Sequence, residues 1–555
     1  MPTELQQISM HSSRRWLLAS VLLAVLYQAI LVASSPAIAK DGIAFVTLAK
    51  DLAQSPVAAM RQADQHPGYP AMILAGRWLV LPLIRSESIL PWVWGARLVS
   101  GVFGVLVIVT VWLVASRVFD YRAAAVAATL VAALPLFREN AADVLSDTPH
   151  LFFYALAVFL VIEGMMRREW LWFLGAGASS GAAYWIRPEG LSVVIVAAVV
   201  LPLWALRYRT MMPGKVLACV GALVVAGAAV SMPYFILSGK FSSKITNKEF
   251  LLPPSSMGGI SLPALSGGSP SGAGPVEETG TRAASASKDP VPAAPSTSTA
   301  KGRTGDHDGG PLRIIGAGIA ELTREIAQGL RWVLLVPLAL GLLAPLKRRS
   351  REEPRALVIG LVVFHALLLS WLFYAGRYIS HRHIMTTMMM IMPWIAAGTL
   401  LVSDKLSSLL PKRDERGEQR RGRLVLGVLL LALVALLTPR TLRPLHSHDV
   451  PIIETSMWLR VQAKPGDAVL SNSPYVPFFA QMPGRVITKS EADAGVNLSE
   501  VGPPYRFVAF DLKSECFDGE WLTQLSGRYE PLEVIGVPSS GGIRTLVLRP
   551  NAPGP

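Results

Sequence analysis

The sequence predicts a polytopic α-helical membrane protein with about eleven transmembrane helices and a small C-terminal extracytoplasmic α/β domain. Two observations predict this class. Hydrophobic residues make up 52% of the 555 residues and charged residues only 16%, with a mean hydropathy of +0.43, a combination that soluble proteins of this length seldom show. Apolar runs of roughly 17 to 25 residues, long enough to cross the hydrocarbon core as helices, recur from Trp16 onward.

The apolar runs divide into expected transmembrane segments at about residues 16–36, 91–116, 122–137, 148–166, 170–186, 190–206, 215–237, 330–346, 356–375, 384–403 and 424–438. We interpret the first segment as an uncleaved span, because its apolar run is long for a signal peptide. The sequence "SSPAIA" at its end is a tolerable cleavage site, however, and cleavage after Ala39 would leave Asp41 near a new N-terminus.

Basic clusters in the connections predict which side of the membrane each loop faces. They lie at residues 117–122, 166–170, 207–215, 347–355 and 412–423, together with Arg14 and Arg15, and the positive-inside rule makes them cytoplasmic. This topology accounts for the formal net charge of +14 better than nucleic-acid binding does, because the basic residues do not follow one face. Five polar motifs then fall together on the outer side: Asp41, "HPGYP" (66–70), "RENAADVLSDTPH" (138–150), "IRPEG" (186–190) and "GRYISHRH" (376–383).

Parts of the transmembrane domain, which we place at residues 1–438, are not expected to span. Residues 39–90 predict an outer loop with interfacial helices, because apolar residues follow Asp41 at helical spacing. Residues 71–85 contain Arg77 and Pro82 and would invert every later loop if they crossed. Residues 255–310, rich in Gly, Pro, Ser, Ala and Thr, predict a disordered outer loop, after which residues 319–333 resume helical spacing.

The last part of the chain, residues 439–555, is expected to form the soluble extracytoplasmic α/β domain. The stretches "WLRVQAKPGDAVLSN", "RFVAFDL", "YEPLEVIG" and "RTLVLRP" predict short strands separated by Pro and Gly turns.

Three outer acidic residues could carry chemistry. Asp41 could be a general base, since a partly desolvated carboxylate at the membrane edge can take a proton from a hydroxyl or amine; it could equally be the N-cap of the helix that follows it. Asp143 and Asp147 precede the fourth span closely enough to reach the same pocket, and Asp147 is also a natural helix cap. Paired carboxylates could hold a divalent cation, whereas the two cysteines, Cys219 and Cys516, exclude a Cys-based metal site. No other cofactor is indicated.

Cationic residues on the same side are candidates for binding a phosphate. Arg187 ends the fifth span, where its guanidinium could grip phosphate oxygens or could instead snorkel or pair with Glu189. The later loop places Arg377, Tyr378, Arg382 and His383 together with His381, and we favour phosphate binding over ordinary loop charge because positive charge is normally depleted on the outer face.

The "HPGYP" motif adds His66 and Tyr69 as substrate-binding candidates, although its prolines and glycine alone are typical of a turn. A P-loop, an HExxH motif, a GxSxG elbow and a Rossmann fingerprint are each missing from a suitable context in the sequence, so nucleotide hydrolysis and serine hydrolase chemistry are unsupported.

Taken in order, these motifs resemble the GT-C membrane glycosyltransferases, specifically the group containing protein O-mannosyltransferases and the aminoarabinose transferases of lipid A. The resemblance covers about residues 14–403. It implies transfer of a hexosyl or pentosyl group from a polyprenyl-phosphate donor to a lipid, glycan or protein acceptor at the outer face. Asp41 matches the first-loop catalytic acid, Asp147 the second acidic position with Asp143 as a close competitor, and Arg187 and the Arg377–His383 loop the cationic groups for the lipid phosphate.

Two other classes of function predict different features. A transporter or flippase of lipid-linked glycans would place charge near the bilayer midplane and show inverted halves, whereas the charges here cluster at outer span ends. A non-catalytic envelope scaffold would tolerate the loss of Asp41. The expected location is a bacterial inner membrane, with membrane lipids and the lipid-linked donor as partners and no nucleic acid.

Overall fold

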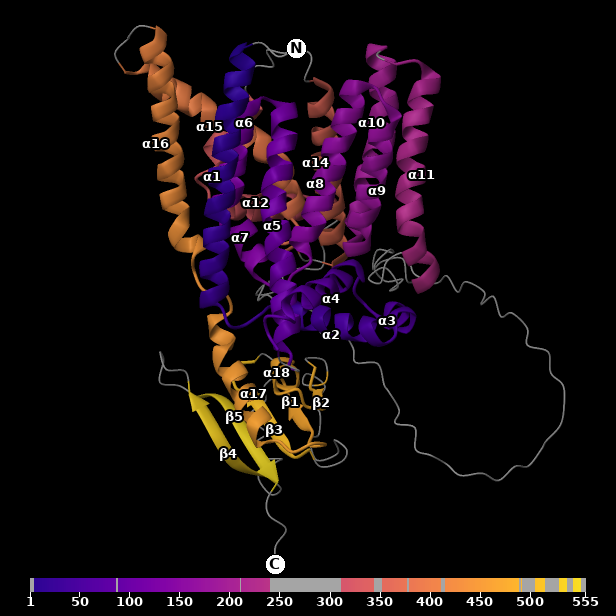
Figure 1. Cartoon of the computed structure of the whole chain (residues 1–555), viewed down its shortest axis with the longest axis vertical. Helices are drawn as coiled ribbons and strands as arrows, with labels where there is room; N and C mark the ends of the chain where they lie inside the picture. The colour runs from indigo at the N-terminus through magenta and orange to yellow at the C-terminus, as the bar shows by residue number, and fades with distance from the viewer. Residues whose placement is uncertain are drawn as a thin grey trace, which may run out of the picture.

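Long apolar helices form a bundle, and a small α/β domain lies at the end of it that is opposite the N-terminus (Figure 1). The computed structural model describes residues 4–85, 88–209, 211–239, 311–343, 352–376, 379–410, 415–488, 491, 505–514, 529–536 and 543–550. The expected loop at 255–310 lies outside the described residues.

Within these ranges, eight helices are long and apolar enough to cross a membrane. They belong to α1 (Glu4–Ser34), α5 (Leu90–Val118), α8 (Asp147–Arg167), α10 (Ser192–Tyr208) with the short η1 (Pro188–Leu191) before it, α11 (Pro213–Ser238), α14 (Glu352–Gly376), α15 (Met385–Ser408) and α16 (Glu415–Thr441). The predicted polytopic helical fold with a small C-terminal sheet is thereby confirmed, while the count of eleven spans stays a prediction.

The remaining expected spans are shorter or broken. The segment 122–137 is a bent pair, α6 (Tyr121–Ala133) and α7 (Pro135–Ala142), with 57° between the two axes. Pro135 explains the bend, because it disfavours helical backbone at Leu134, which is extended at ψ 126°. Helix α9 (Trp170–Ile186) has 17 residues, and the described part of the expected span 330–346, residues 330–343, contains the eight-residue α13 (Leu335–Leu342).

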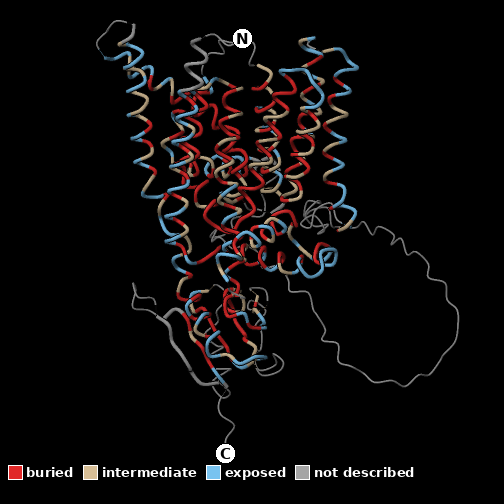
Figure 2. Tube along the Cα trace, viewed as in Figure 1, coloured by how far each residue is buried: buried red, intermediate tan, exposed pale blue. Residues whose placement is uncertain are grey.

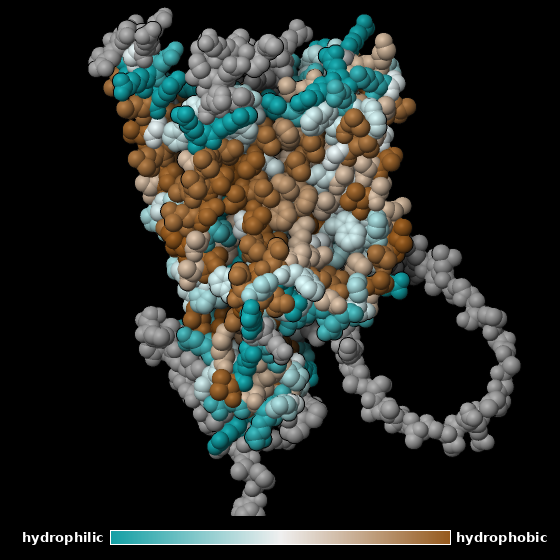
Figure 3. Space-filling model, in the orientation of Figure 1, coloured by the Kyte–Doolittle hydropathy of each residue, from teal (hydrophilic) through white to brown (hydrophobic). Residues whose placement is uncertain are grey.

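The surface of the bundle suits a lipid environment. Buried residues concentrate along the interior faces of the helices (Figure 2), and large apolar side chains such as Leu22, Leu203, Val225 and Leu431 are exposed on the outside. The space-filling view shows a wide apolar belt with hydrophilic residues gathered at the end that carries the N-terminus and over the C-terminal domain (Figure 3). Such a belt would be unfavourable in water, so the chain is an integral membrane protein.

Three short helices lie across the end of the bundle opposite the N-terminus: α2 (Lys40–Gln54), α3 (Pro56–Gln62) and α4 (Gly68–Val80) (Figure 1). Helix α2 buries the apolar residues that the spacing after Asp41 indicated, among them Phe45 and Leu48. Helix α12 (Pro311–Gly329) covers most of the helical stretch expected at 319–333.

The C-terminal domain contains η5 (Ser447–Asp449), α17 (Val450–Gln462), β1 (Val469–Ser471), α18 (Tyr475–Ala480), β2 (Gly484–Val486), β3 (Phe507–Asp511), β4 (Tyr529–Gly536) and β5 (Ile543–Pro550). The sheet order is β2-β1-β3-β5-β4, with β1 parallel to β2 and β3, and β5 antiparallel to β3 and β4. Three strands coincide with predicted ones, but "WLRVQ" is helical in α17, and only "VLS" of that stretch forms a strand.

Candidate active site

Two carboxylates and two arginines meet at the end of the bundle where α2 lies. The Arg382 side chain donates from Nε to Asp147 Oδ2 at 2.9 Å and from Nη1 to Asp41 Oδ2, and so bridges both acids. Arg187 Nη1 donates to the other oxygen of Asp147, Oδ1, and its Nε lies 3.6 Å from Glu189 Oε2. The loop before α15, the end of α9 and the starts of α2 and α8 therefore converge on one ion-paired cluster.

Local backbone structure places the two acids. Asp41 and Asp147 lie in the first turns of α2 and α8, where the helix dipole favours negative charge. Neither acid is the N-cap that the sequence allowed: Ala39 and Ser146 hold those positions, without a capping side-chain hydrogen bond. Gly42 permits a close approach, because a Cβ there would lie 2.9 Å from the Val144 carbonyl oxygen.

The two acids differ in access to solvent. The Asp147 side chain is 1% exposed, while that of Asp41 is 25% exposed. Two arginines offset the cost of burying the charge of Asp147. Burial alone would lower the pKa of Arg382, but the charges of Asp147 and Asp41 outweigh it and raise that pKa above its usual value. Arg382 is thus a permanent cation with one open carboxylate and one buried carboxylate beside it.

Asp143 occupies a different position from the one expected of a competitor to Asp147. Its Oδ1 accepts hydrogen bonds from the Ala39 N–H at 2.9 Å and the Val144 N–H at 2.7 Å, and its Oδ2 lies 2.7 Å from His446 Nε2. Burial would raise the pKa of Asp143, but His446 and the two N–H groups hold it below its usual range. Because both oxygens have partners, the carboxylate holds the chain just before Asp41 in place.

His446 itself was missed by the sequence analysis. Burial would lower its pKa, but the hydrogen bond and charge of Asp143 raise it. Arg97 was also missed; it donates to the carbonyl oxygens of Ser35 and, at 2.8 Å, Ala37. An arginine inside an expected span was a usable signal for Arg97, whereas His446 lies in the segment 439–555 predicted to be soluble, where no motif marked it.

The two candidates from "HPGYP" lie in packed surroundings. His66 is buried, with its ring centroid 5.4 Å from that of Tyr184 and 4.9 Å from that of Tyr234. The fully buried Tyr69 has its hydroxyl 2.8 Å from that of Ser100. Both side chains are therefore packed in the interior, and their role in substrate binding stays a prediction.

The rest of the late loop is partly described. His383 Nδ1 accepts from the Ser380 backbone N–H at 3.1 Å, and His381 Nδ1 lies 2.5 Å from Glu325 Oε2 on α12. Arg377 and Tyr378 lie outside the described residues. Among the described residues, no group of three or more His, Cys, Asp or Glu side chains is arranged to hold a metal ion, and the divalent cation stays untested.

Comparison with known proteins agrees with the fold. Residues 91–233 match the family described as dolichyl-phosphate-mannose-protein mannosyltransferase. No curated protein matches the chain. ArnT from Cupriavidus metallidurans bound to undecaprenyl phosphate is similar in structure, at 13% identity and a TM-score of 0.59, with 96% of this chain and 97% of that chain covered. The apo state of the same ArnT is also 13% identical, with 97% of this chain and 98% of that chain covered and a TM-score of 0.58.

A more distant similarity is to the archaeal oligosaccharyltransferase AglB from Archaeoglobus fulgidus, in complex with an inhibitory peptide and a dolichol-phosphate. It is 11% identical, with 92% of this chain and 71% of that chain covered and a TM-score of 0.51. At these identities the likeness establishes the fold, and the resemblance drawn from the sequence motifs is confirmed at that level.

Proposed function

From the fold that the chain shares with GT-C membrane glycosyltransferases, we propose that it transfers a sugar from a polyprenyl-phosphate donor to an acceptor at the outer face of the membrane, with Asp41 as general base. The observation that carries the proposal is the cluster in which Arg382 bridges Asp41 and Asp147. The cluster combines an accessible carboxylate, Asp41, with two arginines that can bind a phosphate.

Asp41 is the better base of the two acids because it is accessible. An acceptor hydroxyl or amine that approaches its exposed oxygens could give up its proton to Asp41 while its own lone pair forms the bond to the anomeric carbon. The bond between that carbon and the phosphate oxygen breaks, and the polyprenyl phosphate leaves with the electron pair. Asp147, buried between Arg187 and Arg382, keeps the two guanidiniums in position.

Arg382 links donor binding to the availability of the Asp41 carboxylate. In this structure an N–H group of Arg382 holds one of the two Asp41 oxygens. A donor phosphate would compete with Asp41 for the same N–H groups and would gain charge as the sugar departs. Asp41 would then be released for proton transfer only when a donor is present.

The position of the cluster supports the outer side as its location. It lies at the end of the bundle opposite the N-terminus, and basic residues such as Arg168 and Arg209 follow α8 and α10 at the other end (Figures 1 and 3). By the positive-inside rule that basic end is cytoplasmic. We therefore place the cluster and the C-terminal domain outside the cytoplasm, in a bacterial inner membrane.

The test is transfer of labelled sugar by the purified full-length protein in lipid, with a panel of hexosyl and pentosyl polyprenyl phosphates and lipid, glycan and peptide acceptors. Asp41→Asn is expected to abolish transfer, and Asp51→Asn, which changes an exposed acid on the same helix, is the matched control. Equal transfer by wild type and Asp41→Asn would refute the role of Asp41. If wild type transfers no sugar but moves lipid-linked sugar between leaflets, the flippase alternative replaces the proposal.

A further inference from the structure

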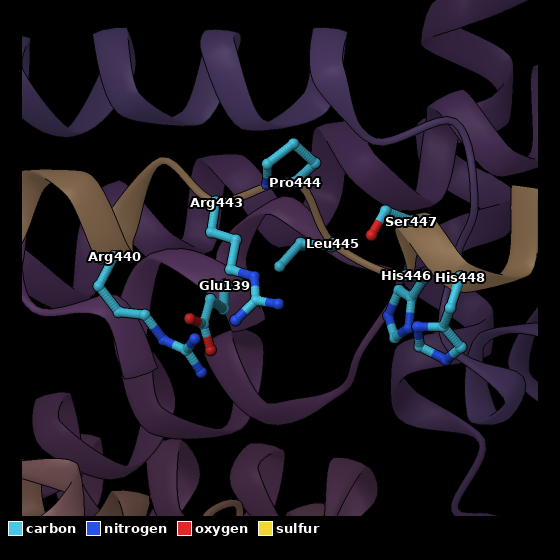
Figure 4. Close-up of a pocket in the computed structure, with 8 residues that line it drawn as sticks. All are labelled: Glu139, Arg440, Arg443, Pro444, Leu445, His446, Ser447 and His448. Atoms are coloured by element: carbon cyan, nitrogen blue, oxygen red, sulfur yellow. The ribbon is translucent and has the colours of Figure 1, made fainter. Parts of the chain in front are cut away.

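A pocket of about 210 Å³ opens where α16 passes into the C-terminal domain (Figure 4). Its lining includes Arg440 from the last turn of α16, Arg443 from the turn that follows, and Glu139 from α7. Arg440 and Arg443 are three residues apart, and the Arg443 N–H still donates to the Arg440 carbonyl oxygen at 3.3 Å. This helical spacing places both side chains on the same side of the chain.

Neither of the two arginines forms a salt bridge with a described residue. Both are exposed, and among the described residues neither has a carboxylate oxygen within the 4.0 Å of a salt bridge. Figure 4 shows both side chains extending toward the same space as Glu139. Arg331 lies close enough to Arg440 and Glu139 to be affected by both charges. The lining of the pocket thus contains two arginines and one glutamate, and the charge of a third arginine, Arg331, acts on the same region.

The histidines of the pocket contact acids that do not belong to its lining. His446 is paired with Asp143, and His448 Nε2 lies 3.3 Å from Asp449 Oδ2. His446 is held in the left-handed region at φ 49°, which is unfavourable for a residue with a side chain. The pairing with Asp143 keeps this wall of the pocket in place, and the lining of the pocket includes none of Asp41, Asp147, Arg187 and Arg382.

The location of the pocket narrows the class of ligand. It lies at the end of a membrane-spanning helix, on the side proposed above as the outer one. Positive charge is normally depleted on that side, so exposed arginines there favour an anionic partner. Simple snorkelling toward the interface would need no pocket. The volume is below the roughly 300–1,000 Å³ of pockets for drug-sized ligands, which suits a phosphate group better than a whole lipid-linked sugar.

We propose that this pocket binds the phosphate of an anionic lipid head group through the guanidiniums of Arg440 and Arg443, at a site separate from the Asp41 cluster. Arginine suits this role because its planar N–H groups match phosphate oxygens in pairs. The site does not depend on the proposed sugar transfer, since it binds a head group and changes no bond.

The experiment measures phosphatidylglycerol binding to the purified full-length protein by native mass spectrometry, with phosphatidylcholine as the neutral comparison and inorganic phosphate as competitor. The double variant Arg440→Gln/Arg443→Gln should bind phosphatidylglycerol about tenfold or more weakly, as expected for the loss of charge-assisted contacts. Lys513→Gln, which removes an exposed cation beyond β3, should bind as wild type does. Arg440→Lys/Arg443→Lys keeps the charge and should be intermediate; a thermal unfolding curve checks that each variant is folded.

The outcomes separate the two sources of the phosphate. Competition by inorganic phosphate would mean that the site recognises the phosphate alone, and binding that resists this competition would mean that the whole head group is recognised; both support the proposal. Equal phosphatidylglycerol binding by wild type and the folded glutamine variant would overturn it. So would a wild type that does not prefer phosphatidylglycerol to phosphatidylcholine.

Discussion

Replacing Asp143 by asparagine tests whether this acid holds the site together rather than reacting. The variant keeps one oxygen, which can still accept from Ala39 and Val144, but it loses the charged oxygen that lies 2.7 Å from His446 Nε2. A hydrogen bond between charged groups contributes about 1.5–3 kcal/mol. Because the His446 side chain is 27% exposed, we discount this figure for solvent screening and expect the free energy of unfolding to fall by about 1–2 kcal/mol.

The pH dependence of that loss follows from the two pKa shifts. The folded pKa of Asp143 lies below its ordinary 3.8, so its contribution to stability is present above 3.8 and is lost as pH falls through the folded value. The folded pKa of His446 lies above its ordinary 6.5, so its contribution is complete below 6.5 and is lost as pH rises through the folded value. The pair therefore stabilises most between pH 3.8 and 6.5 and less on either side.

The assay is thermal unfolding of wild type, Asp143→Asn and the control Asp51→Asn in the same detergent across this pH range. The difference in Tm between wild type and Asp143→Asn should be largest between pH 3.8 and 6.5 and should shrink at higher pH. A difference that stays constant with pH, or one no larger than that of the control, would refute the charged pair.

Other variants test separate contacts. Asp147→Asn leaves the guanidiniums of Arg187 and Arg382 without their shared buried carboxylate, so the free energy of unfolding should fall by about 3–5 kcal/mol and sugar transfer should fall sharply. Arg382→Lys keeps the charge but loses the bridge between the two acids. It should raise the KM for the polyprenyl-phosphate donor, with only a small change in the Tm. Gly68→Ala would place a Cβ 2.6 Å from the Trp185 carbonyl oxygen. The free energy of unfolding should fall by about 1–3 kcal/mol, which a lower Tm would show.

Much of the fold could be predicted from the sequence because the signals are local. Apolar runs mark helices that must satisfy their backbone groups internally, and basic connections mark one side of the membrane. The same signals failed where local propensity is ambiguous: "WLRVQ" has apolar residues that suit a strand or a helix, and it is helical in α17. The described part of the expected span 330–346, residues 330–343, consists of turns and the short α13.

The composition of the candidate site was partly visible in the sequence as well. Asp41, Asp147, Arg187 and Arg382 were singled out because each lies at the outer end of an expected span. Span order places such residues at one end of the bundle, but it does not say which of them touch.

Only the tertiary structure decided the pairing. Arg382 could have faced solvent, yet it joins two acids that lie 341 and 235 positions away along the chain. Asp143 and Asp147 are four residues apart and looked interchangeable, but the backbone between α7 and α8 turns one toward His446 and the other toward the arginines. Periodicity determines which residues share an end or a face, whereas the choice of partner depends on how separate helices pack, and no local pattern encodes that packing.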